Sequence, residues 1–172
     1  DLSGGSAQAF AIKTDGTLWV WGNDGDSLGV LGLGLPNVKY SSPVQVGALT
    51  DWKQVSGSRF HAAAVKTDGT LWGWGSNGNG AIGNSNTTNY SSPVQVGALT
   101  NWKQVSVSDY HTVAVKTDGT LWTWGYDGYG ELGNGTRTDY SSPIQIGTGT
   151  NWSQASCAMN FSAAVKIGRA HV

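Results

Sequence analysis

The chain of 172 residues contains one cysteine, few charged side chains and no long apolar run. The single Cys157 excludes an intrachain disulfide and any zinc site made of several cysteines. Ten basic and eleven acidic residues give a formal charge of -1, which offers no electrostatic attraction for nucleic acid or an anionic membrane. No segment approaches the roughly 18 apolar residues of a membrane helix. We therefore expect neither nucleic-acid binding nor membrane insertion.

The chain has instead a repeat of about fifty residues. The sequence SSPVQVGALT at 41–50 returns unchanged at 91–100, and VKTDGTLW at 65–72 returns at 115–122. Tryptophan recurs at positions 52, 102 and 152. The first period is longer than the others, and its extra residues fall between Gly22 and Tyr40. A length change confined there indicates a surface loop.

Each period contains four short segments of strand character and no helical apolar stripe. In one period they are 43–47, 52–56, 61–66 and 70–75. Asp68 and Gly69 separate the last two and predict a type I′ hairpin turn, with positive φ at both residues. We therefore predict four-stranded antiparallel units at 43–75 and 93–125, flanked by two three-stranded units.

The predicted fold is all-β: a fragment of a β-propeller made of four-stranded antiparallel blades, with about three and a half repeats of about fifty residues. We assign residues 1–166 to this partial propeller, with repeat units 1–53, 54–103, 104–153 and 154–166. The segment 167–172, IGRAHV, breaks the repeat and resembles the translation of a sequencing-adapter oligonucleotide. We expect it to be a non-native tail on a repeat array that naturally continues. We also expect self-association through the open propeller ends.

The recurring pattern resembles a known repeat. Its fullest copy reads HTVAVKTDGTLWTWG at 111–125 with GELG at 130–133, and it is similar to the regulator of chromosome condensation repeat. The resemblance recurs at 61–83 and 8–29 and covers residues 1–166. It implies a β-propeller, typically of seven blades. It leaves the function open, because family members include a guanine-nucleotide exchange factor on chromatin, a plant ultraviolet-B photoreceptor and a secreted bacterial inhibitor of β-lactamases.

Two features separate the chain from some of these members. The residues before His61 are Ser-Arg-Phe and those before His111 are Ser-Asp-Tyr, so neither site carries the tryptophan of the photoreceptor motif Gly-Trp-Arg-His-Thr. The near-identical repeats, low charge and abundant Ser, Thr and Asn look more like bacterial surface or secreted members. We therefore favour an extracellular or cell-surface location in a bacterium.

No catalytic, metal or cofactor pattern recurs. His61 and His111 share a repeat position that is Gln8 in the first unit and Phe161 in the last. A metal ligand or general base would not alternate with phenylalanine, so we predict imidazoles that are packed within a blade and bonded to backbone. The GxGxxG matches at 78–83 and 128–133 lack the helix that would face a pyrophosphate, and we interpret them as turns. We predict no enzyme activity, no cofactor and no metal, and a structural thiol at Cys157.

The nine tryptophans all lie at repeat positions. Trp72 and Trp74 are two residues apart and therefore share one face of their strand. We predict that Trp74 and Trp124 are buried between neighbouring units. The tryptophans of the incomplete units should be more exposed; they are Trp19, Trp21 and Trp152.

Differences between copies of the repeat concentrate in two loops, near 58–60 and 76–79 and at their equivalents fifty residues later. The substitutions introduce Arg, Asp and aromatic residues, which are suited to contact surfaces. The predicted partner-binding residues are Arg59, Phe60, Asp109, Tyr110, Tyr126 and Tyr129.

These features favour a non-enzymatic propeller scaffold for protein–protein interaction, belonging to a larger surface or secreted protein. One alternative is a carbohydrate-binding propeller that uses loop aromatics and amides to bind a glycan. The other is a guanine-nucleotide exchange regulator of a small GTPase.

Overall fold

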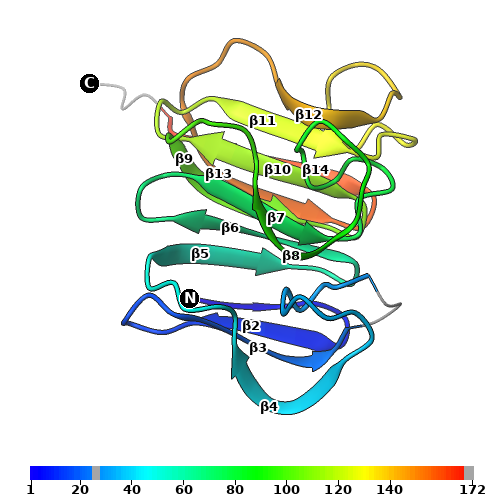
Figure 1. Cartoon of the computed structure of the whole chain (residues 1–172). Helices are drawn as coiled ribbons and strands as arrows, with labels where there is room; N and C mark the ends of the chain where they lie inside the picture. Colours follow the sequence, from blue (N-terminus) through cyan, green and yellow to red (C-terminus); the bar gives the residue numbers. More distant parts are fainter. Residues whose placement is uncertain (25–27, 169–172) are drawn as a thin grey trace.

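The computed structural model describes residues 1–24 and 28–168, and the regular elements of these residues are all β-strands (Figure 1). Three antiparallel sheets have four strands each, and a fourth has two. In Figure 1 the blue sheet lies at the bottom, and the green and yellow sheets follow above it. The first sheet comprises β1 (Leu2–Gly4), β2 (Gln8–Ile12), β3 (Leu18–Asn23) and β4 (Lys39–Gln45). The second comprises β5 (Trp52–Gly57), β6 (His61–Lys66), β7 (Leu71–Gly75) and β8 (Tyr90–Gln95). The third comprises β9 (Trp102–Val107), β10 (His111–Lys116), β11 (Leu121–Gly125) and β12 (Tyr140–Gln145). The last comprises β13 (Trp152–Ala158) and β14 (Phe161–Lys166).

The predicted all-β fold of four-stranded antiparallel blades is confirmed, but the predicted grouping of strands is wrong. Trp72 pairs with Gln95 and Gly73 with Val94, so the segment at 93–97 joins the sheet before it. The four-stranded units therefore span 52–95 and 102–145 instead of 43–75 and 93–125. For the same reason the first unit has four strands and the last has two, where three were predicted for each.

The loops explain why the strands are grouped into sheets in this way. The long loop after β7 folds back and returns the chain antiparallel to that strand as β8. The short link at 96–101 then crosses from the edge strand of one sheet to the first strand of the next. Sequence proximity favoured pairing across the short link, whereas the structure pairs strands across the long loop.

The Asp-Gly hairpins are present, but the turn type differs from the prediction. Gly69 has a φ of +79°, whereas Asp68 is not among the residues with positive φ. The Gly69 N–H donates to the Lys66 carbonyl (3.0 Å) and the Lys66 N–H to the Thr70 carbonyl (3.0 Å). This is a type I turn closed by a glycine bulge. The Asp68 carboxylate accepts bonds from the N–H (2.9 Å) and hydroxyl (2.7 Å) of Thr70, which explains why aspartate fits the turn without adopting positive φ.

The hydrophobic core lies between neighbouring sheets. Phe10 of the first sheet packs with Trp52 and Trp74 of the second in one buried cluster. The arrangement recurs one sheet later around Trp102 and Trp124. Trp72 also contacts the Trp52 ring, at 6.1 Å between centroids, as expected for a strand face shared with Trp74.

Trp74 and Trp124 are fully buried between units, as predicted. Each is also anchored by a hydrogen bond that the sequence did not indicate. The Trp74 indole N–H donates to the Val30 carbonyl of the preceding unit, and that of Trp124 to the Ala81 carbonyl, both at 2.8 Å. The indole therefore ties the loop of one blade to the sheet of the next.

The exposure predicted for the tryptophans of the terminal units is partly confirmed. Trp21 and Trp152 are half-buried, whereas Trp74 and Trp102 at the matching positions are buried. Trp19 is also half-buried, but so are its equivalents in the other units. The exposure of Trp19 therefore does not distinguish the first unit from the others.

Ile167 continues the β-pattern for one residue, because its N–H donates to the Asn151 carbonyl at 2.8 Å. Residues 169–172 of the suspected tail lie outside the described residues. Within the described ranges, there is no helix with the length and apolar character needed to cross a membrane.

Candidate functional site

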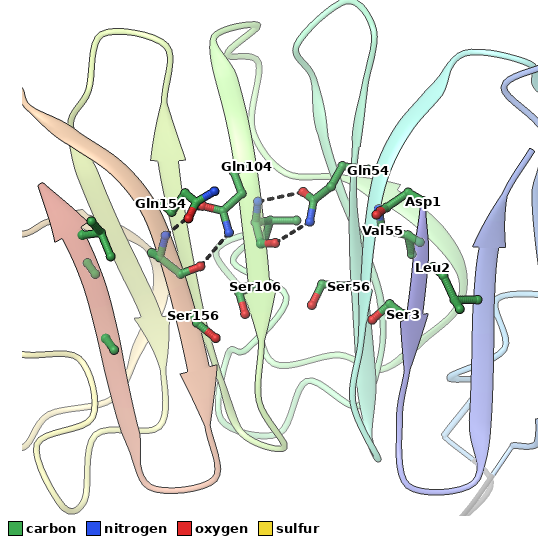
Figure 2. Close-up of a pocket in the computed structure, with 15 residues that line it drawn as sticks. Asp1, Leu2, Ser3, Gln54, Val55, Ser56, Gln104, Ser106, Gln154 and Ser156 are labelled. Carbon is green, nitrogen blue, oxygen red and sulfur yellow. Dashed lines mark hydrogen bonds between the residues drawn. The ribbon is translucent and has the colours of Figure 1, made fainter. Parts of the chain in front are cut away.

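The first strands of the four sheets line an open groove of about 480 Å³. Figure 2 shows a row of amide side chains across these strands and a row of serines below it. The Gln54 amide donates to the Val105 carbonyl (2.8 Å) and accepts from the Val105 N–H (2.9 Å). Gln104 makes the same two bonds to Ala155, at 2.6 and 2.8 Å. Each glutamine amide thus bonds the N–H and C=O of one residue in the next sheet, as a neighbouring strand would. We call these bonds the glutamine seam.

The serine row has the same role. Ser3, Ser56 and Ser106 accept hydrogen bonds from backbone N–H groups of the following sheet, at 3.0 to 3.1 Å. At the first sheet the Asp1 carboxylate takes the place of the seam glutamine and accepts from the Val55 N–H (2.8 Å). The polar lining of the groove is therefore largely engaged in joining the blades.

The predicted partner-binding residues meet on a different surface, at the loops beyond the far ends of the first strands. Phe60 and Tyr110 lie 5.3 Å apart between ring centroids. Tyr110 lies 6.3 Å from Tyr126, which lies 6.1 Å from Tyr129. The four rings form a continuous series over two blades, which we call the aromatic strip. Two of them are well exposed: Tyr110 at 42% and Tyr129 at 71%.

Arg59 and Asp109 complete this surface. The Arg59 guanidinium lies 4.6 Å from the centroid of the Phe60 ring, within cation–π distance. The backbone N–H of Arg59 donates to the Asp109 carboxylate at 3.2 Å. All six predicted residues are therefore brought together, with one charge of each sign beside the rings.

A buried carboxylate fixes the loop that carries Tyr126 and Tyr129. The Asp127 side chain is fully buried and accepts a hydrogen bond from the Leu132 N–H at 2.9 Å. In the preceding blade Asn77 holds the same position and accepts from the Ile82 N–H at 2.9 Å. The loop framework is thus repeated, while the neighbouring side chains differ.

The two repeat histidines are fully buried. Burial lowers the pKa of His61 to about 3 and that of His111 to about 4. The His61 Nε2 lies 2.8 Å from the Thr112 hydroxyl and the His111 Nε2 lies 2.9 Å from the Ser162 hydroxyl, both in the next sheet. The imidazoles are buried as predicted, but each Nε2 bonds a hydroxyl group of the next sheet, where packing within one blade and a bond to backbone were predicted. Both histidines therefore join blades in their neutral form.

Cys157 lies at a sheet-to-sheet contact, where its thiol donates to the Ser106 carbonyl at 3.3 Å. Burial raises the pKa of this thiol to about 12. The reactive thiolate is therefore disfavoured at neutral pH. Across residues 1–24 and 28–168, no three His, Cys, Asp or Glu side chains gather as metal ligands.

Comparison with known families identifies the repeat. The model described as "Regulator of chromosome condensation (RCC1) repeat" matches residues 15–65, 68–115 and 118–165. The chain belongs to the RCC1 repeat family. A second model of the same description matches residues 52–81 and 102–131.

Curated RCC1-repeat relatives are much longer than this chain. The human regulator of chromosome condensation is 32% identical over 82 residues, which are 48% of this chain and 20% of the relative. The human E3 ubiquitin-protein ligase HERC2 is 33% identical over 93 residues, which are 51% of this chain and 2% of the relative. The chain therefore corresponds to a small part of each.

Solved RCC1-repeat structures show the same fold. Prp20p from Saccharomyces cerevisiae superposes with a TM-score of 0.81 at 20% identity, over 98% of this chain and 44% of the yeast chain. Human WBSCR16 gives 0.82 at 18% identity, over 98% and 44% of the two chains. A further structure shows the yeast protein with Kap60 bound. The chain thus has the fold of part of an RCC1-type propeller.

The glutamine seam was missed in the sequence. The signal was present, since glutamine recurs at 54, 104 and 154 and serine at 56, 106 and 156. Polar residues two apart on a strand share a face, but no role was assigned to this face. The hydrogen-bond partners of these glutamines and serines depend on where the next blade lies, and the repeat pattern alone does not predict that position.

Proposed function

We propose that this RCC1-repeat chain is a non-enzymatic scaffold that binds a protein partner through the aromatic strip. The observation that supports it is the continuous contact of Phe60, Tyr110, Tyr126 and Tyr129 on the loop surface. Aromatic residues and arginine are enriched where proteins bind one another. Exposed rings on loops held by a rigid sheet can bind with little loss of conformational entropy.

The polarity around the strip indicates the chemistry of the partner. Asp109 lies beside Arg59 and Phe60 at one end of the ring series, and its carboxylate can meet a positive charge of a partner. The rings provide an apolar centre, and Tyr129 adds an exposed hydroxyl. We infer that the partner presents an apolar side chain beside a charged one. Kap60 bound to the yeast relative gives a precedent for a protein partner of an RCC1-repeat protein.

The test is selection of a random phage-displayed peptide library on the immobilised chain. Selected peptides should bind the wild type and lose at least about tenfold in affinity on the double variant Tyr126→Ala with Tyr129→Ala. Leu99→Ser is the matched control, because Leu99 is 50% exposed but lies near the hairpin turns at the other edge of the sheets. Peptides that bind the double variant and the wild type equally would contradict the proposal.

Two further assays separate the alternatives. If the wild type binds a glycan on an array and the double variant does not, the result would support the carbohydrate-binding alternative. Accelerated nucleotide release from a small GTPase would support the exchange-factor alternative. Circular dichroism of the double variant should match the wild type, because Tyr129 is exposed and Tyr126 is only half-buried.

A further inference from the structure

We propose that the protein partner presents an arginine, whose guanidinium sits against the Tyr110 and Tyr126 rings and pairs with the Asp109 carboxylate. We call this place the arginine seat. The inference rests on the proposed function, because it names the partner group that the aromatic strip would bind. The seat lies on loops of the second and third sheets, and each of these sheets packs against a sheet on either side.

The preceding blade already holds an arginine on the equivalent ring. The Arg59 guanidinium lies 4.6 Å from the centroid of Phe60, which is within cation–π distance. In the next blade Asp109 and Tyr110 occupy these two positions. Among the described residues, no lysine or arginine lies over the Tyr110 or Tyr126 ring. The third sheet thus has the ring and a carboxylate, and an arginine of the partner would supply the cation.

The Asp109 carboxylate has no ion pair within the described ranges. Its Oδ1 accepts the backbone N–H of Arg59 at 3.2 Å, and its other oxygen accepts no hydrogen bond from the described residues. An ionised carboxylate has about four lone-pair sites and can accept two parallel N–H bonds from a guanidinium. Asp109 can therefore bind a partner's arginine without giving up its bond to the neighbouring loop.

The tyrosine rings form a corner instead of a parallel stack. Tyr126 is inclined by 62° to Tyr110 and by 69° to Tyr129, with centroids 6.3 and 6.1 Å apart. Rings that meet at such angles border a common space, so a flat cation can stack on one ring while another ring borders it. Arginine suits this corner better than lysine, because its planar group stacks on an aromatic face and still bonds a carboxylate with two N–H groups.

The charges near the Tyr126 hydroxyl are negative. Desolvation raises the pKa of this hydroxyl most, followed by the effect of Tyr129. The charges of Glu131 and Asp139 act in the same direction. Arg137 is exposed two residues before Asp139, but among the described residues no ion pair joins them. A cation is therefore favoured over an anion at this part of the strip.

Three phage-displayed heptapeptide libraries test the seat, each with random residues around a fixed central arginine, glutamine or glutamate. On the immobilised chain, the arginine library should be enriched at least about tenfold over the glutamine library, and the glutamate library should be enriched least. A selected peptide is then synthesised with citrulline in place of arginine, which keeps the planar shape but removes the charge. The citrulline peptide should bind at least about tenfold more weakly.

Variants of the chain locate the charge that the arginine meets. Asp109→Asn keeps an oxygen for the Arg59 N–H, so it should fold normally, yet it should weaken the arginine peptide about tenfold and barely affect the citrulline peptide. Asp109→Lys should reverse the preference and enrich the glutamate library. Asp68→Asn is the matched control, because it removes the same charge in a turn that tolerates asparagine, at the opposite end of the β6–β7 hairpin from His61.

The results separate this inference from the function on which it rests. Peptides that need Tyr126 and Tyr129 but bind equally well with arginine, citrulline or glutamate would overturn the arginine seat and support the protein-binding strip. Peptides that bind the double variant Tyr126→Ala with Tyr129→Ala as well as the wild type would overturn both. An arginine preference that survives Asp109→Asn unchanged would also overturn the seat, since another group would then meet the charge.

Discussion

Trp74 provides the sharpest test of how the blades are held together. Its ring is fully buried, 6.5 Å from Phe10 and 6.3 Å from Trp52 between centroids. Its indole N–H reaches the Val30 carbonyl in the preceding unit at 2.8 Å. Trp74→Ala therefore removes both a ring between two sheets and the bond that fixes a loop.

The expected cost follows from these two contributions. A buried tryptophan removes roughly 200 Å² from water, and about 25 cal/mol per Å² gives an upper bound of about 5 kcal/mol. Alanine retains part of this, while the unpaired Val30 carbonyl adds about 1 kcal/mol. We expect Trp74→Ala to lower the free energy of unfolding by about 3–5 kcal/mol, as for other buried aromatic residues. Trp74→Phe should cost about 1–2 kcal/mol, chiefly through the lost bond.

Equilibrium urea unfolding followed by circular dichroism measures these costs, at a protein concentration where a single species sediments. Circular dichroism is preferable to fluorescence because the chain has nine tryptophans. Trp21→Ala is the matched control, since Trp21 occupies the same repeat position but is only half-buried, and it should cost at most about half as much.

Two results would refute the reasoning. A cost below about 1 kcal/mol for Trp74→Ala would show that the inter-sheet core does not limit stability. Equal costs for Trp74→Ala and Trp21→Ala would show that a preceding blade adds nothing at this position.

Two further predictions concern the turns and the histidines. Gly69→Ala should destabilise the chain by at least about 2 kcal/mol in the same unfolding assay, because φ is +79° and a Cβ would overlap the Thr100 carbonyl; Gly97→Ala, at φ +63° with open space, should cost about 1 kcal/mol. The pKa of His61 is lowered by burial from 6.5 to about 3, so the unfolded state binds the proton first: stability should be constant above about pH 6.5 and fall below it, by about 2 kcal/mol for this histidine at about pH 5. His61→Gln, which copies the residue of the first unit, should remove that part of the fall, and an unchanged pH profile would contradict the assignment.

The sequence predicted the strands well because strand formation here is local. Alternation, the Asp-Gly turns and the fifty-residue period each depend on neighbours a few residues apart. The residues of the aromatic strip were also selected from the sequence, since copies of one unit differ where packing does not constrain them, and their role in binding stays a prediction. Phe60 and Tyr126 are far apart in the chain, yet both contact Tyr110.

The blade phase could not be predicted in this way. The repeat is compatible with a blade that begins at the 43–47 type of segment and with one that begins at the 52–56 type. Only the pairing of strands in space decides between these two groupings. The long loop that returns β8 to β7 is held by the buried amide of Asn77, which accepts from the Ile82 N–H and donates to the Asn86 carbonyl at 2.9 Å. Because Asn77 closes this loop from within, β7 and β8 can pair although many residues separate them. The role of Asn77 was not recognised in the sequence.

The residues at the histidine position vary together with the residues they bind. His61 faces Thr112 and His111 faces Ser162, each a hydroxyl that can bond an imidazole nitrogen. The equivalent of these hydroxyls in the second sheet is Ala62, which offers none. There the preceding blade carries Gln8, whose longer amide reaches past the alanine to a backbone carbonyl, that of Arg59, at 3.3 Å.

The variation from Gln8 to His61 and His111 therefore keeps one inter-blade hydrogen bond with whatever acceptor or donor the next sheet provides. A repeat position that varies need not be free of constraint, because its partner varies with it. Comparing the copies one position at a time argued against a catalytic histidine there; only the pairing of sheets shows which second position varies with it.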